Sequence, residues 1–249
     1  LSKITKKTVV YDFRQNDLKN GGHGAPLAPI FHKVLSQKFK ITYSYFLNIG
    51  GITNYTCIDD SSPEKLKMKD LYISAGDIGP GMCLVDHWVR TNSKKKYDND
   101  GKLAKSGKVD INLLEEACWD HEKIKSNKTH DVKDFDGSFV KGLSLKDGAA
   151  TLIDFTVRNL IPSLHFTEEH GYNLVLCGGG RKNKVLVKKL KKFSTRIKLI
   201  DDYGIDGDFV ESQAFAYLAV RSYLKLPISF PETTGCIKPS IGGVIVKNY

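Results

Sequence analysis

The segment YNLVLCGGGRKNKVLVKKLKKF, residues 172–193, decides the fold class. It begins with a short apolar run, continues through three glycines, and ends in a basic segment whose apolar residues recur at helical spacing. This order predicts a buried strand, a glycine turn and an amphipathic helix. A second pair follows, with RIKLID (196–201) as a strand and DGDFVESQAFAYLAVRSYL (206–224) as a long helix. Strands that alternate with helices are typical of an α/β protein, which is the fold class that we predict.

The earlier part of the chain adds short strands and more helices. Runs of β-branched and aromatic residues predict strands over 8–11, 43–49, 53–58 and 70–75. The last three follow one another closely, so we expect a β-meander that leads to a site. Helical spacing of apolar residues predicts helices over 30–39, 82–90, 111–119 and 145–164. Asp147 is the N-cap candidate of the last helix, which has a proline near its end.

The composition indicates a folded, basic protein. The chain has 249 residues, 41% of them hydrophobic, and a formal net charge of +10 at pH 7. This apolar content suffices to bury a core. The basic residues concentrate in SKKKYD (93–98) and VKKLKKF (187–193), where lysines alternate with Val187 and Leu190. That alternation is typical of the wet face of a helix, so we expect a solvated surface and no nucleic-acid partner.

The cysteines and the apolar runs bear on the compartment. No apolar run approaches the ~18 to 20 residues that span a bilayer, and no charged-then-apolar signal peptide opens the chain. The five cysteines are odd in number and never spaced as Cys-x-x-Cys, which argues against both a disulfide framework and a zinc site. We therefore expect a cytoplasmic protein without a membrane partner. The cysteines are Cys57, Cys83, Cys118, Cys177 and Cys236.

One carboxylate stands in an unusual setting, the stretch GDIGPG at residues 76–81. Asp77 lies there between glycines and a proline, just after an apolar stretch and before the predicted helix at 82–90. Glycine and proline predict that the strand ends in a tight bend. Two interpretations stay open: an aspartate that bonds its own backbone in a turn, or a catalytic carboxylate held on a rigid edge.

Two further glycine turns are candidate ligand sites. LVLCGGGRKN (174–183) puts three glycines between a strand and a basic helix, and LNIGGITNYT (47–56) puts Gly50 and Gly51 between Asn48 and Asn54. Glycine lets backbone approach a flat or phosphorylated ligand closely, but it also permits close packing of strand against helix. The pattern alone leaves both roles open.

A polar loop near the N-terminus and a helical carboxylate complete the candidates. DFRQND supplies Asp12, Arg14 and Asp17 beside the loop GGHGAPL, a combination suited to a polar substrate. Glu211 lies in the first turn of a helix, where compensation of the helix dipole is a sufficient explanation. The histidines His23, His32 and His87 have no partner at metal-ligand spacing, so we expect no metal site.

The order of these motifs carries a resemblance. DFRQND and GGHGAPLAP are followed by LNIGGITN, DIGPG with VDHW, YDNDG, LCGGG, GIDGDFVESQAFAYLAVR and finally LPISFPETTG. The series resembles the anhydro-N-acetylmuramic acid kinase family over nearly the whole chain. The resemblance implies the two-lobed fold of sugar kinases, Hsp70 and actin, closing on ATP and Mg²⁺. It also implies a double reaction, in which water opens the 1,6-anhydro ring while O6 takes the γ-phosphoryl group of ATP.

The resemblance assigns roles residue by residue. It implies that Asp77 is the base that activates water, with Glu211 as a second acidic residue near the site. It further implies a homodimer, with residues 1–45 as a remnant of the N-terminal lobe, 46–230 as the C-terminal ATPase lobe and 231–249 as a tail. The substrate side comprises Asp12, Arg14, Gly24, Ala25 and Pro26. The nucleotide side comprises Asn48, Gly50, Gly51, Gly178, Gly179, Gly180 and Asn183.

The sequence also departs from the family pattern. Ile78 and Met82 stand where the family has threonine and asparagine, and in SNKTHDVKDF Lys128 is kept while Val132 takes the place of an arginine. The Gly-Thr-Ser-x-Asp-Gly turn that cradles the β- and γ-phosphates does not occur in the chain. A truncated remnant with weak nucleotide or sugar binding is therefore the alternative to an active kinase.

Overall fold

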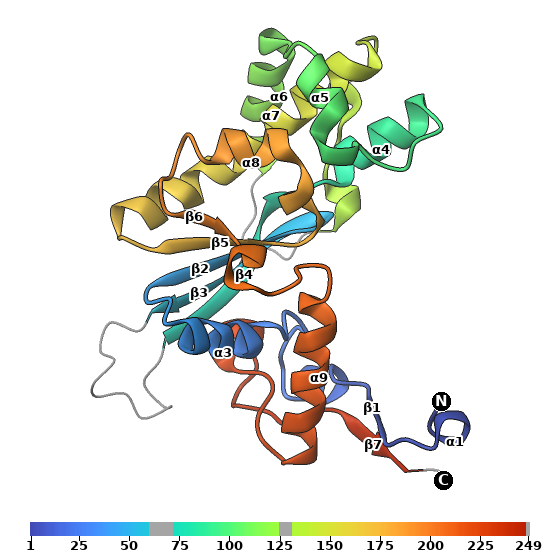
Figure 1. Ribbon diagram of the computed structural model, residues 1–249, viewed down its shortest axis with the longest axis vertical. Coiled ribbons are helices and arrows are strands. Elements are labelled where there is room, and N and C mark those ends of the chain that lie inside the picture. Colours follow the sequence, from blue (N-terminus) through green and yellow to red (C-terminus); the bar gives the residue numbers. More distant parts are fainter. Residues whose placement is uncertain (60–71, 125–130, 248–249) are drawn as a thin grey trace. The chain divides into compact units, whose positions relative to one another are not determined.

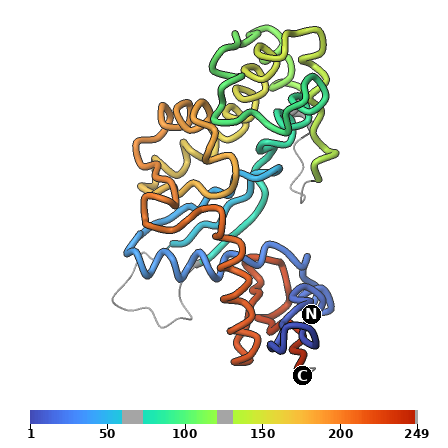
Figure 2. Tube along the Cα trace, turned by 45° about the vertical axis from the view of Figure 1, so that its right-hand side comes forward, coloured from blue at the N-terminus to red at the C-terminus, as the bar shows by residue number. Residues whose placement is uncertain are grey.

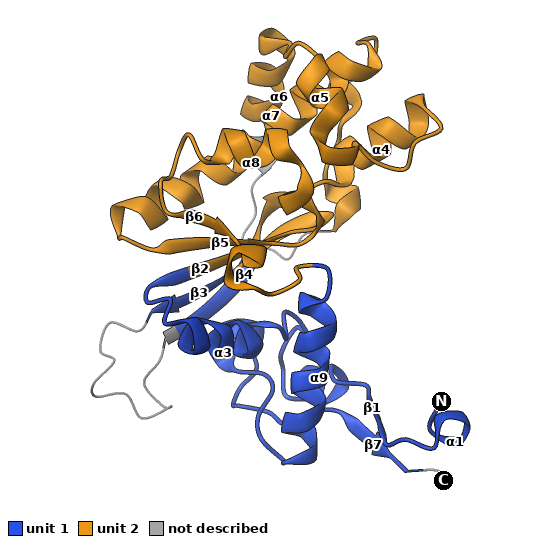
Figure 3. Cartoon of the chain, in the orientation of Figure 1, with its two compact units in different colours: residues 1–44, 56–76, 208–249 blue, residues 45–55, 77–207 orange. Residues whose placement is uncertain are grey.

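The computed structural model describes residues 1–59, 72–124 and 131–247 and divides the chain into two compact units (Figures 1 and 3). Unit 1 comprises residues 1–44, 56–76 and 208–249, and unit 2 comprises residues 45–55 and 77–207. Both ends of the chain therefore belong to unit 1. This division is one of compactness, and the lobes predicted at 1–45, 46–230 and 231–249 stay a prediction.

A five-stranded sheet with the order β4-β3-β2-β5-β6 supplies strands to unit 2: β5 and β6 lie wholly in it, whereas β2, β3 and β4 have residues in both units (Figures 1 and 3). Strands β2, β3 and β4 are neighbours in this order, which confirms the predicted β-meander. Strands β5 and β6 pair in parallel, with Leu174 opposite Ile197. The α/β class is thus confirmed. The strands are β2 (Ser44–Ile49), β3 (Ile52–Asp59), β4 (Tyr72–Pro80), β5 (Asn173–Cys177) and β6 (Ile197–Leu199).

Helices pack around this sheet, and α7 is central among them. It contacts α4, α5, α6 and α8, and its residues Leu152, Ile153 and Leu160 are fully buried. On the sheet, Phe46 and Ile49 of β2 are equally buried. The core of unit 2 therefore lies between the sheet and α7. The helices are α4 (Cys83–Asn92), α5 (Lys102–Ser106), α6 (Ile111–Ile124), α7 (Leu145–Glu169) and α8 (Lys184–Leu190), with 3₁₀ turns at Asn99–Gly101, Val132–Asp134, Ser138–Val140, Gly179–Lys182 and Ile200–Tyr203.

Two details of α7 correct the sequence analysis. Its N-cap is Ser144, whose hydroxyl accepts a hydrogen bond from the Asp147 amide at 3.2 Å, so Asp147 is a residue of the first turn and not the cap. The Asp147 carboxylate accepts from Ser144 in return and from the backbone of Lys108 at 2.7 Å. The helix also continues beyond Pro162 to Glu169. Packing against four other helices outweighs the hydrogen bond that a proline removes.

The GDIGPG stretch is strand and not a bend, since β4 continues through Asp77 to Pro80. None of its glycines has a positive φ. Close approach explains Gly81, where a Cβ would lie only 2.3 Å from the Gly50 carbonyl oxygen, whereas a Cβ on Gly79 would meet Asn159 Cβ at an ordinary contact distance of 3.7 Å. The bend that glycine and proline suggested therefore lies just after this stretch, at Met82, between the end of β4 and the start of the following helix at Cys83.

Unit 1 joins segments from both ends of the chain. Strands β1 (Val9–Tyr11) and β7 (Val244–Val246) pair antiparallel, which places the N-terminal and C-terminal segments side by side (Figure 2). A small apolar cluster of Leu27, Ile30, Leu218 and Ile228 connects α3 with α9. The helices of the unit are α1 (Ser2–Thr5), α2 (Gln15–Lys19), α3 (Pro29–Phe39), α9 (Val210–Tyr223) and α10 (Pro231–Thr234).

None of the helices in the described part of the chain combines enough length with enough apolar character to cross a membrane. The longest, α7, contains Asp147, Arg158 and Glu168 among its 25 residues.

Candidate functional site: a glycine-lined cleft in unit 2

A cleft of about 1070 Å³ opens in unit 2 where several of the predicted motifs meet. Clefts that hold small molecules and cofactors have volumes of roughly 300 to 1,000 Å³, so the space suffices for a nucleotide. The motifs that meet here lie up to about 130 residues apart in the sequence. Of the predicted nucleotide-side residues, the cleft is lined by Gly50, Gly51, Gly179, Gly180 and Asn183.

The Gly50-Gly51 turn forms one edge of the cleft and also holds the end of β4. Its two carbonyl oxygens accept hydrogen bonds from the amides of Met82, Gly81 and Cys83 at 2.8, 2.9 and 3.2 Å. The Gly81 Cα passes so close that no side chain would fit between the two turns. The cleft edge and the strand that carries Asp77 are therefore one connected backbone structure.

The three glycines of the second turn have different roles. Gly178 has φ +77°, and a Cβ there would lie 2.5 Å from Asn48 Oδ1. A Cβ on Gly180 would lie 2.4 Å from Ile49 Cγ2, whereas one on Gly179 would meet nothing within 4 Å. Close packing on the end of β2 thus accounts for Gly178 and Gly180. Gly179 alone is open to the cleft, where bare backbone can meet a ligand.

Asn183 connects the glycine turn to α8 and to the YDNDG motif. Its Oδ1 caps the helix by accepting from the amides of Val185 and Leu186, both at 3.1 Å. Gly101, with φ +70°, packs against it so tightly that a Cβ would lie 2.4 Å from the same Oδ1. Asn183 Nδ2 is buried and has no hydrogen-bond partner among the described residues. A buried donor without an acceptor is costly, so Nδ2 is suited to a ligand acceptor in the cleft.

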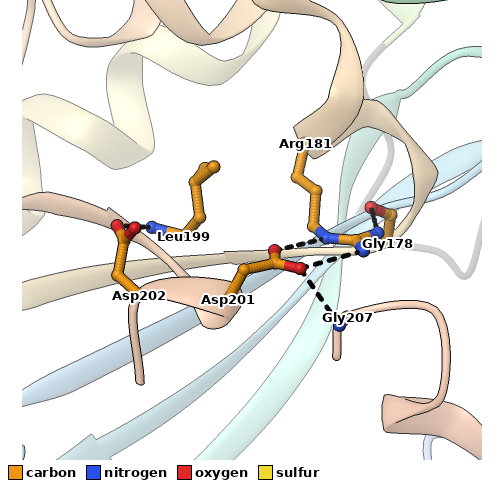
Figure 4. A network of polar contacts seen from close by, with 6 residues as sticks. All are labelled: Gly178, Arg181, Leu199, Asp201, Asp202 and Gly207. Atoms are coloured by element: carbon orange, nitrogen blue, oxygen red, sulfur yellow. Dashed lines mark hydrogen bonds and ion pairs between the residues drawn. The ribbon is translucent and has the colours of Figure 1, made fainter. Parts of the chain in front are cut away.

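Both signs of charge line the cleft. Burial raises the pKa of Asp86, an effect that Arg90 opposes and Asp98 reinforces. The hydrogen bond from Arg181 lowers the pKa of Asp201 below its usual range, so this carboxylate is ionised at neutral pH (Figure 4). Lysines from the turn and from α8 supply the positive charge that phosphates need. These are Lys182, Lys184, Lys188 and Lys191.

Asp77 lies within β4, three residues before the end of the strand, and its side chain is half-buried. Side chains alternate along a strand, so Asp77 shares its face with Gly79, which lies against Asn159 of α7. Asp77 does not itself line the cleft, but its strand is bonded to the Gly50-Gly51 edge. The carboxylate is thus on a strand and not in the bend that the sequence analysis predicted, and its catalytic role stays a prediction.

The predicted substrate-side residues lie in unit 1 and form one loop. Arg14 Nε donates to the Gly24 carbonyl at 2.9 Å, and the Gly24 amide donates to the Asp17 carboxylate at 2.7 Å. Gly24 has φ +72°, and the next peptide bond, from Ala25 to Pro26, is cis. The structure therefore brings together Arg14, Gly24, Ala25 and Pro26. Asp12 and Glu211 are exposed residues of the same unit, Asp12 at φ +56° and Glu211 in the first turn of α9.

The sequence analysis named Asp17 as a candidate for holding a polar substrate, but the structure shows that it organises this loop. Asp17 is 1% exposed and accepts from the Gly24 amide and from the Thr234 hydroxyl, each at 2.7 Å. Burial raises its pKa, but the hydrogen bonds that it accepts outweigh burial and hold the pKa below the usual range. The signal was the PETTG motif, which had been noted without a role. It provides the hydroxyl that holds Asp17.

The sequence analysis predicted structural histidines and no metal site. His32 is buried, contacts Thr56 Oγ1 through Nδ1 at 2.9 Å, and burial lowers its pKa to about 4. It is thus a neutral structural residue. Among the described residues, no group of three or more His, Cys, Asp or Glu could hold a metal ion. Val132 is exposed, while Lys128 lies outside the described residues.

Comparisons with known proteins give one consistent family. The model of the anhydro-N-acetylmuramic acid kinase family matches residues 1–248. Among curated proteins, the anhydro-N-acetylmuramic acid kinase of Pelagibacter ubique is 49% identical, with 100% of this chain and 67% of the relative covered. Those of Rhizobium johnstonii and Zymomonas mobilis are 38% and 37% identical, each with 98% of this chain and 65% of the relative covered.

The chain thus spans about two-thirds of the length of the curated relatives that it matches. The family match extends over both units, since it includes the substrate-side loop of unit 1 and the glycine-lined cleft of unit 2. The prediction made from the ordered motifs is therefore confirmed, and the chain belongs to the anhydro-N-acetylmuramic acid kinase family.

Proposed function

We propose that this protein is an ATP-dependent kinase that acts on 1,6-anhydro-N-acetylmuramic acid. Water adds to C1 of the sugar, the C1–O6 bond breaks, and O6 takes the γ-phosphoryl group of ATP, giving N-acetylmuramic acid 6-phosphate and ADP. This places the protein in cell-wall recycling, in the cytoplasm. The observation that supports the proposal most directly is the cleft, where the two predicted nucleotide motifs of one kinase family converge.

ATP is proposed to bind in the cleft of unit 2. Gly179 offers open backbone to a flat or phosphorylated group, and Asn183 Nδ2 offers a buried donor without an acceptor. Phosphoryl transfer depends on positioning and on electrostatic stabilisation, which backbone donors and the cleft lysines can supply. Mg²⁺ usually keeps several waters and binds through phosphates with one or two carboxylates. The cleft carboxylate Asp86 fits that role, and Mg²⁺ would neutralise phosphate charge there, whereas the two oxygens of Asp98 accept the amides of Leu103 and Ala104.

Asp77 is proposed to be the base that takes a proton from the attacking water. A general base must lie within about 2.6 to 3.2 Å of its proton donor, which favours a carboxylate on a fixed strand over one on a loop. The hydrogen bonds from residues 81–83 to Gly50 and Gly51 fix the end of that strand. Ile78 and Met82 leave the surroundings of Asp77 more apolar than in the family pattern.

The loop of unit 1 is proposed to hold the sugar. Arg14 and the Gly24–Pro26 turn supply a cation and a shaped backbone, Asp12 adds an exposed carboxylate, and Glu211 supports the site. We also propose that the protein forms a homodimer and has no nucleic-acid partner. Size-exclusion chromatography with light scattering tests the first point, and a DNA and RNA retention assay at several salt concentrations tests the second.

The test of the proposed function is the mass of the sugar product. The protein is incubated with ATP, Mg²⁺ and 1,6-anhydro-N-acetylmuramic acid, and we expect the sugar to gain one phosphate and one water. Asp77→Asn should abolish turnover while ATP binding persists. Asp136→Asn, which changes a loop carboxylate bonded to Ser138, is the control and should leave turnover unchanged. Equal rates for wild type and Asp77→Asn would refute the assigned base, and an unchanged sugar would refute the proposed activity.

A further inference from the structure

A charge network adjoins the cleft at a position that the family motifs do not assign. Arg181 directly follows the glycine turn, and its side chain is only 4% exposed. Its Nε donates to Asp201 Oδ2 at 2.7 Å and its Nη2 to Asp201 Oδ1 at 3.3 Å, so the carboxylate is held by two bonds (Figure 4). The remaining nitrogen, Nη1, donates to the Gly178 carbonyl oxygen at 2.9 Å. One guanidinium thus connects Asp201 with the first peptide of the turn.

The bond to Gly178 determines how the turn faces the cleft. A peptide group is planar and trans, so the Gly178 carbonyl and the Gly179 amide lie in one plane and point in opposite directions. Holding the carbonyl oxygen on Arg181 therefore fixes the direction of the Gly179 N–H. Gly179 is also the residue whose Cα faces open space at the cleft. The planar, forked guanidinium can serve carboxylate and carbonyl together, which a lysine ammonium cannot do with the same geometry.

Gly207 closes the network on its other side. Its amide donates to Asp201 Oδ1 at 3.3 Å, and a Cβ there would lie 2.1 Å from Arg181 Nε. Only glycine leaves room for the guanidinium at this position. The charge of Arg181 is thus buried and paired with the Asp201 carboxylate, and removing that carboxylate would remove the two bonds that hold the buried guanidinium on this side.

We infer that Arg181 is a positioning residue of the nucleotide site, anchored by Asp201 and acting through the Gly178–Gly180 turn. The inference rests on the proposed function in that the cleft is taken as the ATP site. The other possible role of Arg181 is a direct contact with the nucleotide. A direct contact would depend little on Asp201, whereas the positioning role requires both Arg181 and Asp201. The two roles therefore predict different behaviour for Asp201→Asn.

The experiment measures the Kd of Mg-ATP by calorimetry and the KM of ATP by turnover, for wild type, Arg181→Lys, Asp201→Asn and the double variant. Each single change should weaken ATP binding about tenfold, the factor that corresponds to one charged hydrogen bond. The double variant should bind Mg-ATP with the same affinity as the single variant that binds it less tightly, because both changes remove the same interaction. The KM of the sugar and kcat should change by less than about twofold, since no reacting atom is touched.

The matched control is Asp202→Asn. Asp202 is the next residue and also accepts one backbone hydrogen bond, from Leu199 at 2.8 Å, but it has no bond to the glycine turn (Figure 4). This variant should keep wild-type ATP affinity. Gly207→Ala provides a second approach if a charge variant fails to fold, because it keeps both charges and displaces the guanidinium. It should weaken ATP binding in the same way.

The outcomes separate the inference from the proposed function. Unchanged ATP affinity in Asp201→Asn, or equal losses in Asp201→Asn and Asp202→Asn, would overturn the inference while leaving the kinase activity established. Wild-type protein that binds ATP without phosphorylating the sugar would refute the proposed function, and the Kd values alone would then decide the inference. Wild-type protein that binds no ATP would overturn both. A lowered Tm with unchanged Kd in every variant would show a purely structural ion pair.

Discussion

Asp17→Ala is expected to destabilise unit 1 by about 4 kcal/mol, because it removes the charged acceptor of two buried hydrogen bonds. The Asp17 side chain is almost fully buried and accepts from the Gly24 amide and the Thr234 hydroxyl, each at 2.7 Å. A hydrogen bond to a charged group contributes about 1.5 to 3 kcal/mol, so two of them give about 3 to 6 kcal/mol. The loop that carries Arg14 and the Gly24–Pro26 turn should lose its shape in the same variant.

Two further variants each remove only part of the hydrogen bonding of Asp17, so they should lower the free energy of unfolding less. Asp17→Asn keeps the volume and one carbonyl oxygen, so it should cost about 2 kcal/mol. Thr234→Val keeps the shape of the partner and removes only the hydroxyl, at a cost of about 1 to 2 kcal/mol. Because both changes remove one shared bond, the double variant should be less destabilised than the sum of the single variants by about 0.5 kcal/mol or more.

Urea unfolding followed by circular dichroism measures these differences. Asp12→Asn is the control: Asp12 is exposed with φ +56°, a conformation that asparagine tolerates, so its free energy of unfolding should not change. The reasoning would be refuted if Asp17→Ala stayed within about 0.5 kcal/mol of this control, the range of ordinary surface substitutions.

The dependence of the free energy of unfolding on pH in the acid range tests the role of Asp17 independently. Its folded-state pKa is lower than the unfolded value, because the accepted hydrogen bonds outweigh the effect of burial. A depressed carboxylate pKa contributes stability above the unfolded pKa, and this stability is lost as the pH falls through the folded pKa. Wild-type protein should thus lose stability below about pH 4, and the loss should be smaller in Asp17→Asn.

Three further predictions follow from burial and close contacts. Gly179→Ala should weaken ATP binding with an unchanged Tm, whereas Gly180→Ala should lower the Tm by several degrees, since only the second Cβ meets an atom, at 2.4 Å. Because burial lowers the pKa of His32 to about 4, the unfolded chain takes up a proton first, and stability should fall as pH drops from 6.5 towards 4 in wild type but less in His32→Gln. Thiol labelling at pH 8 should modify Cys118 but not Cys177, whose pKa burial raises to about 12, and urea should expose both.

The elements with strong periodicity were predictable from the sequence. Strand β5, helix α8 and the β-meander follow from apolar runs, turn residues and helical spacing, and the structure confirms them. The choice of cap at α7 was less accessible, because Ser144 and Asp147 are both good N-cap residues and form a reciprocal pair. Local propensity cannot decide between two residues that satisfy the same helix end.

The glycines show what the sequence could not resolve. Packing and ligand contact were both open for the 178–180 turn, and the structure divides them within three consecutive residues. The deciding atoms belong to Asn48 and Ile49, about 130 residues earlier in the chain. Likewise, GDIGPG predicted a bend because glycine permits one, whereas β4 continues to Pro80, and glycine is required at position 81 because a Cβ there would lie 2.3 Å from the Gly50 carbonyl oxygen. The residue type determines which backbone conformations and contacts are possible. Contacts from segments that are distant in the sequence determine which of them occurs.

The Gly50-Gly51 turn gives the proposed reaction a physical basis for coupling its two halves. The same two residues line the proposed nucleotide cleft and accept the hydrogen bonds of residues 81–83, which directly follow the strand that carries Asp77. A nucleotide that orders this turn would also order the end of β4, because no side chain separates Gly81 from the Gly50 carbonyl oxygen. Hydrolysis of the anhydro bond without ATP would release O6 with no phosphoryl group to receive. A base whose strand is bonded to the ATP cleft is therefore better suited to this double reaction than a base on an independent turn.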